Sequence, residues 1–136
     1  MPNPRSIKDA DVKVTTAYGN VNFTANGNTL DLGQVLPYPV LEHVNAQIVT
    51  TAGTNAANNK NINITVQHSD VDLNANFTNI AELAPLTIQE VSTGYAATTR
   101  NIALTPGTKR YIRLRIAGEA NGGNANDGTA TLRLVF

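Results

Sequence analysis

The sequence predicts an all-β protein, a jelly-roll-like β-sandwich of about eight antiparallel strands. Apolar and polar residues alternate with a period of two along most of the chain, as in strands that bury one face. Turn residues separate these runs at short intervals, and apolar residues hardly occur at helical spacing. Because a single open sheet of this length would leave exposed edges and an uncovered face, the 136 residues predict two packed sheets.

Four segments show the alternation most clearly, and each places its apolar side chains on one face. In chain order they are residues 40–49, 61–68, 109–117 and 129–136. The side chains that this pattern directs into the core are Val40, Val44, Ala46, Ile48, Ile62, Ile64, Val66, Ile112, Leu114, Ile116, Ala130, Leu132, Leu134 and Phe136. These four segments are the backbone of the predicted sandwich.

Shorter runs rich in β-branched residues predict the remaining strands. They are residues 11–17, 20–25, 78–83, 86–91 and 100–105. Glycine- and asparagine-containing turns separate nearly all of them, and the stretches 51–60 and 118–128 are predicted to be loops.

The domain organisation is an N-terminal extended arm at residues 1–12 followed by one β-sandwich domain at 13–136. The arm contains Pro2 and Pro4 among alternating charges and lacks a core-forming pattern. No apolar run reaches the length of a signal peptide or a membrane span, so we expect neither classical export nor a membrane partner.

The composition argues against several kinds of functional site. The chain is formally neutral with ten basic and ten acidic residues, and Asn and Thr make up roughly a quarter of it. It has no Cys and two His, so we expect no disulfide, no metal centre and no cofactor. His43 and His68 stand in no recognised catalytic signature, and His68 is expected at a strand end or partly buried. The sequence therefore predicts a protein without enzymatic activity.

One segment has the beginning of a calcium-binding motif. In SDVDLNANF, at 69–77, Asp70, Asp72 and Asn74 follow the D-x-D-x-N spacing of a calcium loop. Ala75 stands at the turn-glycine position and Ala81 at the position of the closing glutamate. We therefore expect an Asx-type turn after the 61–68 strand rather than a metal site, with a weak cation site at Asp70 and Asp72 left open.

The charge distribution points to a possible contact surface. Residues 100–136 carry six basic and two acidic residues, a net +4, whereas residues 1–99 carry a net −4. Alternation puts Tyr111, Arg113 and Arg115 on one face of their strand, which is either an ordinary solvated sheet face or a binding stripe. A short basic stripe with few aromatics does not suit nucleic acid, whereas an arginine-rich stripe suits a complementary protein surface.

The order of several motifs resembles that of the small jelly-roll cement, or decoration, proteins of tailed-bacteriophage capsids. TLDLGQ at 29–34 precedes the long strand at 40–51, and QHSD at 67–70 is followed by Phe77. ALTPGTKRYIRLRI at 103–116 and TATLRLVF at 129–136 complete the order. The resemblance covers about residues 29–136 and is strongest at 106–114, where this chain has a shorter Pro-Gly-Thr turn than the family pattern.

This resemblance implies a protein that binds the outer surface of an assembled capsid and bridges neighbouring major capsid subunits. It implies the major capsid protein as partner and the virion as location, after synthesis in the host cytoplasm. We expect self-association, as a dimer in preference to a trimer, because a small chain spans a symmetric junction by closed symmetry. The interface residues predicted are Tyr111, Arg113, Arg115, Arg133, Pro2, Pro4 and Arg5.

The alternative is a β-sandwich tail or receptor-binding module of a phage particle that binds carbohydrate. Sugar sites use aromatic platforms, and this chain has no Trp and four Tyr. The composition therefore favours the capsid reading.

Overall fold

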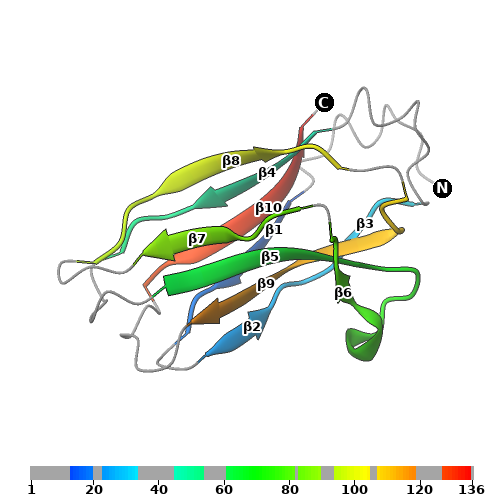
Figure 1. Ribbon diagram of the computed structural model, residues 1–136, viewed down its shortest axis with the longest axis horizontal. Helices are drawn as coiled ribbons and strands as arrows, with labels where there is room; N and C mark the ends of the chain where they lie inside the picture. The colour runs from blue at the N-terminus through cyan, green and yellow to red at the C-terminus, as the bar shows by residue number, and fades with distance from the viewer. Residues whose placement is uncertain are drawn as a thin grey trace.

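The computed structural model describes residues 13–19, 23–33, 45–53, 61–81, 83–89, 94–104, 107–118 and 127–135. Within them, two antiparallel sheets pack face to face (Figure 1). This is the β-sandwich that the period-two alternation predicts.

The first sheet has four strands in the order β1-β10-β4-β8. Its strands are β1 (Lys13–Ala17), β10 (Thr129–Val135), β4 (Asn45–Thr50) and β8 (Thr98–Ile102). The first described strand therefore lies against the last one, with Lys13 opposite Arg133.

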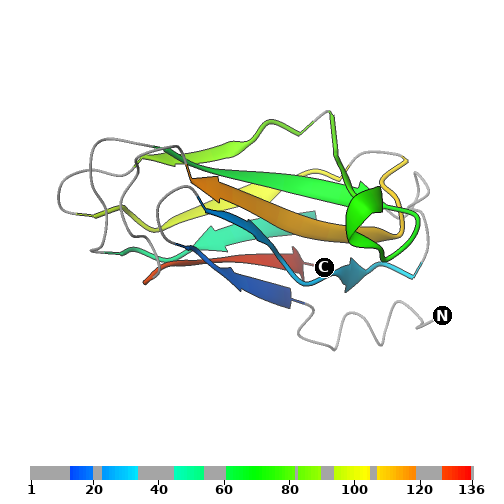
Figure 2. The same cartoon turned by 90° about the horizontal axis from the view of Figure 1, so that it is seen from below.

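The second sheet is built around two long neighbours, β5 (Asn61–Ser69) and β9 (Tyr111–Gly118). The remaining strands are β2 (Thr24–Asn26) and β3 (Leu30–Asp31), which pair with β9, and β6 (Thr78–Asn79) and β7 (Leu86–Gln89), which pair with β5. A short 3-10 helix, η1 (Asn74–Asn76), follows the end of β5 (Figure 2).

The strand order is that of a jelly roll. Because β5 occupies one side of β9, β2 and β3 share its other side, and β6 and β7 likewise share one side of β5. If β2 with β3 and β6 with β7 are each counted as one interrupted strand, the ten strands of the described residues become eight. The sheets then run 1-8-3-6 and 2-7-4-5 in chain order, which confirms the predicted jelly-roll-like sandwich of about eight strands.

The core lies between the two sheets and contains the side chains that alternation directed inward. Ile48 and Leu132 are paired in the first sheet, and Ile64 and Ile116 in the second, and all four are buried. The remaining predicted core residues that fall in the described ranges are also buried: Ala46, Ile62, Val66, Ile112, Leu114, Ala130 and Leu134. Val40, Val44 and Phe136 lie outside the described residues.

The shorter predicted strands differ from the structure mainly at their ends. The segment predicted at 78–83 is a strand only at its first two residues, because Ile80 turns into the core and donates its backbone N–H to Val66. The segment predicted at 100–105 begins earlier, at Thr98, and ends at Ile102. The strand β3 was not predicted, since two residues are too few to show alternation.

Several sequence predictions lie outside the described residues. They concern the arm at 1–12, most of the loop at 51–60 and most of the loop at 118–128. In the described part of the chain, no helix is long and apolar enough to cross a membrane.

Candidate interaction surface

The outer face of the second sheet carries a polar network centred on a buried arginine. Arg113, on β9, is only 7% exposed. Its guanidinium donates from Nε to Gln67 Oε1 (3.0 Å) and from Nη1 to Asn74 Oδ1 (2.6 Å), and it lies 4.1 Å from the centre of the Phe77 ring. Gln67 in turn donates to Asn79 Oδ1 (3.0 Å). The segment after β5 therefore folds over the sheet and covers this arginine.

Burial also affects the electrostatics of Arg113. Removal of the guanidinium from water lowers its pKa, and the nearby charge of Arg115 lowers it further, while Asp72 acts in the opposite direction. A buried guanidinium needs its hydrogen-bond partners, because an unpaired buried charge is strongly destabilising. The two amide oxygens and the Phe77 ring provide that environment here.

The 70–76 loop follows β5 and includes η1. The side chains of Asn26 and Thr29 tie this loop to the second sheet. Thr29 donates to Asp72 Oδ1 (2.7 Å), and Asn26 donates to Asn74 Oδ1 (3.4 Å). Together with the bond from Arg113, these contacts join segments more than 35 residues apart in sequence. The loop is thus held over the ends of β2 and β9.

Hydrogen bonds within the loop fix its two halves. The backbone N–H of Val71 donates to Ser69 Oγ (3.1 Å), and the N–H of Asn76 donates to the carbonyl of Leu73 (2.9 Å). Between these bonds, the side chains of Val71 and Leu73 are 43% and 62% exposed. In the described ranges, these two are the large hydrophobic residues that are exposed. We call Val71 and Leu73 the apolar tip.

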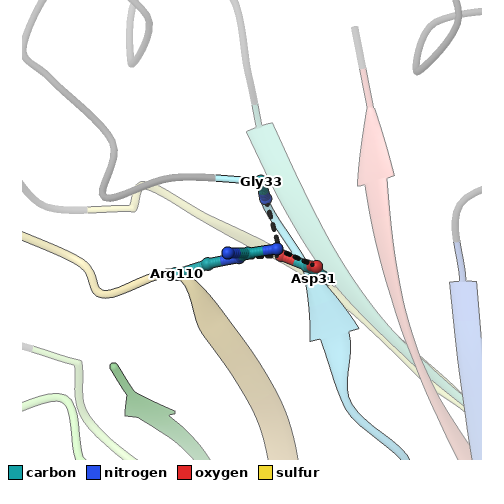
Figure 3. Close-up of polar contacts among 3 residues, drawn as sticks. All are labelled: Asp31, Gly33 and Arg110. Atoms are coloured by element: carbon teal, nitrogen blue, oxygen red, sulfur yellow. Dashed lines mark hydrogen bonds and ion pairs between the residues drawn. The ribbon is translucent and has the colours of Figure 1, made fainter. Parts of the chain in front are cut away.

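An ion pair fixes the chain at the same end of the sheet (Figure 3). Arg110 donates from Nε and Nη2 to the two carboxylate oxygens of Asp31 (2.7 and 2.8 Å), and the N–H of Gly33 donates to Asp31 Oδ1 (2.8 Å). The hydrogen bonds from Arg110 are the main reason that the pKa of Asp31 is lowered. Gly33 has a φ of 81°, a conformation that favours glycine.

The segment before β9 contacts the end of β5. Lys109 Nζ lies 3.2 Å from Asp70 Oδ2, and the backbone N–H of Lys109 donates to His68 Nδ1 (3.3 Å). His68 is half-buried at the penultimate position of its strand, which confirms the prediction for it. This histidine therefore has a structural role that orients the turn before β9.

The structure separates the residues predicted to form one interface. Tyr111 and Arg115 are half-buried on the outer face of the second sheet, and the Arg110 guanidinium lies 5.0 Å from the Tyr111 ring centre. Arg133 is exposed on β10, in the other sheet, opposite Lys13 and Gln47. Three further predicted residues lie outside the described ranges: Pro2, Pro4 and Arg5.

The predicted stripe at Tyr111, Arg113 and Arg115 is half-buried at its two ends and buried at its centre. Alternation placed Arg113 on the outer face, and it is there, but the segment that includes Asn74 and Phe77 covers it. Two of its nitrogens, Nε and Nη1, donate to side chains within the chain. A partner that docks on this face therefore meets the covering loop before it meets Arg113.

The calcium-like spacing at Asp70, Asp72 and Asn74 does not gather three ligands. The carboxylate of Asp70 pairs with Lys109, that of Asp72 accepts from Thr29, and the amide oxygen of Asn74 accepts from Arg113. Among the described residues, no group of three or more His, Cys, Asp or Glu side chains is placed to hold a metal ion. His43 lies outside the described residues.

A pocket of about 380 Å³ opens between the sheets beside β8. The Arg100 guanidinium lines it and donates from Nη1 to the carbonyls of Ala84 (3.3 Å) and Pro85 (3.1 Å). The apolar side chains that line the pocket are Ile48, Val66, Leu83 and Ile102. Arg100 Nη1 thus links β8 to the segment that precedes β7.

Sequence reasoning missed the apolar tip and the cover over Arg113. The two tip residues follow the end of β5, in a loop where the period-two rule of a strand no longer says which side chains are buried. No local pattern indicated that Phe77 would pack on Arg113, since the two residues are far apart in the sequence.

The comparisons with known proteins identify no relative in sequence. No protein-family description matches the chain, and no curated protein matches it. The fold is similar to that of a CBM61 module in complex with beta-1,4-galactotriose (13% identity, 98% of this chain and 77% of the other, TM-score 0.42).

Two further solved structures are similar at the same level. One is a carbohydrate-binding module, CBM28, specific for non-crystalline cellulose (11% identity, 91% of this chain and 72% of the other, TM-score 0.44). The other is a CBM4 structure (12% identity, 91% and 78%, TM-score 0.37). All three TM-scores are below 0.5, so these likenesses carry no inference about a ligand.

Proposed function

We propose that this protein is a non-catalytic decoration protein that binds the outer surface of an assembled phage capsid and bridges neighbouring major capsid subunits. The proposal starts from the resemblance of residues 29–136 to jelly-roll cement proteins. Its partner is the major capsid protein, and its location is the virion surface.

One structural observation carries the proposal. Three of the segments that carry the resemblance meet at one end of the second sheet: residues 29–33, 67–70 and 107–111. Asp31 of the first binds Arg110 of the third, and Asp70 of the second pairs with Lys109 of the third. Gly33 and Gly107 both have φ values above 80°, so each glycine is needed where it stands. Two ion pairs therefore join these segments into one structural unit.

The surface chemistry also favours a protein partner over a sugar. Sugar-binding faces present open aromatic rings. In the described ranges, Tyr18, Tyr95 and Phe77 are buried, Phe23 is half-buried against the core and stacked on Tyr18, and the half-buried ring of Tyr111 has the Arg110 guanidinium 5.0 Å from its centre. The carbohydrate-binding alternative therefore lacks an open platform on the described surface.

We also propose that the protein self-associates, as a dimer in preference to a trimer. A small chain that bridges capsid subunits across a symmetric junction does so most simply with closed symmetry of its own. Sedimentation at micromolar concentration measures this state, and a monomer alone would contradict it.

Co-sedimentation tests the capsid proposal. The protein is mixed with particles assembled from the major capsid protein encoded in the same genome, and bound protein is quantified after pelleting. A glycan array that includes galactan and cellulose oligosaccharides is probed in parallel with the same preparation. We expect saturable binding to particles and none to glycans. Glycan binding without particle binding would replace the proposal with the carbohydrate-binding alternative.

A further inference from the structure

We propose that the edge of the first sheet at β8, together with the pocket beside it, binds an extended segment of the partner protein. The segment that it fits carries a carboxylate and an apolar side chain two residues apart. The inference rests on the proposed function in one respect, since it takes the partner to be the major capsid protein. The sequence had instead suggested the basic stripe on β9 as the contact.

The open edge of the sheet is the first argument. Among the described strands, the order β1-β10-β4-β8 leaves β8 paired on one side alone, and Figure 1 shows it at the margin of the sandwich. An edge strand has a row of backbone N–H and C=O groups with which another extended segment can pair, and β8 contains no proline to interrupt it. The opposite edge strand, β1, lies beside β2 of the second sheet.

A cation on the inward side of this edge is the second argument. Arg100 stands opposite Ile48 in the pairing of β8 with β4, so the two side chains share a face of the sheet, and Ile48 is buried in the core. An inward-facing charge is one way in which proteins keep a sheet edge from pairing with any strand it meets. A carboxylate on the incoming segment would neutralise this charge. The edge is therefore selective for an acidic segment.

The guanidinium of Arg100 has two free donors for that carboxylate. Its Nη1 donates to the carbonyls of Ala84 and Pro85, and this side chain makes no further hydrogen bond or ion pair with the described residues. Nε and Nη2 remain, and they form a fork that matches the two oxygens of a carboxylate. Arg110 uses the same two nitrogens to bind Asp31 in this protein. A partner carboxylate can thus bind Arg100 without breaking its existing bonds.

The pocket of about 380 Å³ supplies the apolar half of the site. Arg100 lines it together with four apolar side chains, Ile48, Val66, Leu83 and Ile102. Side chains two residues apart in a strand lie on the same face, about 7 Å from each other. An extended segment beside β8 can therefore direct a carboxylate at Arg100 and place the next inward side chain in the apolar part of the pocket. The partner segment should accordingly have the pattern acidic-x-apolar.

A second copy of the chain fits this edge less well than a different protein does. Antiparallel pairing of two β8 strands would put both Arg100 side chains on the same face of one continuous sheet. The strand Thr98–Ile102 contains no carboxylate that could lie between them. Like charges so close together disfavour the pairing. The charge on this edge therefore favours a different, acidic partner.

The experiment titrates the protein with three blocked heptapeptides and follows the backbone amide signals of β8 by NMR. TTETLTT has the inferred spacing, TTKTLTT replaces the carboxylate by an ammonium group, and TTTELTT puts the same two side chains on opposite faces of the strand. Wild type, Arg100→Gln and Arg100→Glu are compared, and the melting temperature of each is recorded. Arg100→Gln keeps an amide donor for the carbonyls of Ala84 and Pro85, so it tests the charge if Arg100→Glu does not fold. The same proteins are tested for affinity to particles assembled from the major capsid protein.

We expect wild type to bind TTETLTT at least fivefold more tightly than either of the other peptides, with the largest signal shifts in β8. Arg100→Gln should lose the preference for the glutamate peptide over the lysine peptide, and Arg100→Glu should reverse it. Both variants should bind particles more weakly than wild type, Arg100→Glu by at least tenfold.

Equal or absent binding of the three peptides, or shifts centred away from β8, overturns the inference. Wild-type affinity for particles in both Arg100 variants overturns it and leaves the proposed function standing. Selective peptide binding without any binding of wild type to particles removes the proposed function, and with it the major capsid protein as the partner of this edge.

Discussion

Charge reversal at Arg113 tests whether this side chain belongs to the fold or to a binding surface. Arg113→Glu places a carboxylate against the amide oxygens of Gln67 and Asn74, where the guanidinium now donates two hydrogen bonds. The amide of Gln67 cannot turn to donate to the new carboxylate without breaking its bond to Asn79. The carboxylate would also face the Phe77 ring. We expect this variant to be destabilised rather than merely unable to bind.

The magnitude follows from the contacts that are lost. Each hydrogen bond from the cation contributes roughly 1.5 kcal/mol or more, and the cation–π contact with Phe77 contributes about 0.5–1 kcal/mol. Removing the guanidinium also relieves its desolvation, which offsets part of this loss. We therefore expect the free energy of unfolding to fall by about 3 kcal/mol.

The assay is urea denaturation followed by circular dichroism, with Arg115→Glu as the matched control. Arg115 lies two residues along the same face of β9 and is half-buried, and none of the described hydrogen bonds involves its side chain. Its variant should stay within about 0.5 kcal/mol of wild type. An Arg113→Glu protein as stable as the control would refute the reasoning, because it would show that the contacts with Gln67, Asn74 and Phe77 contribute nothing.

Four further predictions concern stability. The hydroxyl of Tyr18 is buried near Thr50, but the Thr50 hydroxyl is already bonded to the Thr98 backbone and the Tyr18 hydroxyl makes no well-formed hydrogen bond, so Tyr18→Phe should raise the free energy of unfolding by about 1 kcal/mol at pH 7, measured in urea. Burial raises the pKa of Tyr18 to about 12, so wild-type stability should fall as pH rises from about 10 to 12, where only the unfolded chain ionises, and Tyr18→Phe should lessen this fall. Because Arg110 lowers the pKa of Asp31, the ionised carboxylate stabilises the folded protein at neutral pH, and this stabilisation is lost as the pH falls below about 4. The urea midpoint of Asp31→Asn should therefore decrease less in acid than that of wild type. Leu114→Ala should cost roughly 2–4 kcal/mol, because it leaves a cavity between the sheets.

Each of these predictions has a contrary outcome. Destabilisation by Tyr18→Phe would show that the hydroxyl is hydrogen-bonded, for instance to an internal water. If the urea midpoints of wild type and Asp31→Asn decrease equally in acid, the pair with Arg110 does not persist in solution. A loss below about 1 kcal/mol for Leu114→Ala would mean that the core collapses around the smaller side chain.

The core could be predicted from the sequence because burial in a sandwich depends on a local rule. Alternation alone identifies Ile62, Ile64 and Val66 on β5, and their buried faces follow from the pleat. The class of fold followed from the number and spacing of the strands, but the strand order did not, since periodicity does not say which strands pair. The pairing of β1 with β10 illustrates this, because no feature of residues 13–17 points to the end of the chain.

The candidate site could be predicted only in part, because it depends on contacts between distant segments. Period two placed Arg113 on the outer face correctly, but a face is exposed only if nothing folds over it. The cover comes from residues 74–79, which form a helical turn and a two-residue strand that have no strong sequence signal. The partners of Asp31 and Asp72 were likewise beyond a local pattern, since they lie 79 and 43 residues away.

The pairing of the first described strand with the last has a consequence for how the chain folds. Thr15 and Thr131 share a hydrogen bond across 116 residues, and β10 also fills the gap between β1 and β4. While the chain is being synthesised, β1 and β4 have no common neighbour until β10 has also left the ribosome, so the first sheet cannot close before then. Topologies with such distant contacts fold on the millisecond-to-second scale. Until β10 pairs with both strands, the apolar side chains of β4 are open to water, which makes this interval the one in which the chain is most exposed to aggregation.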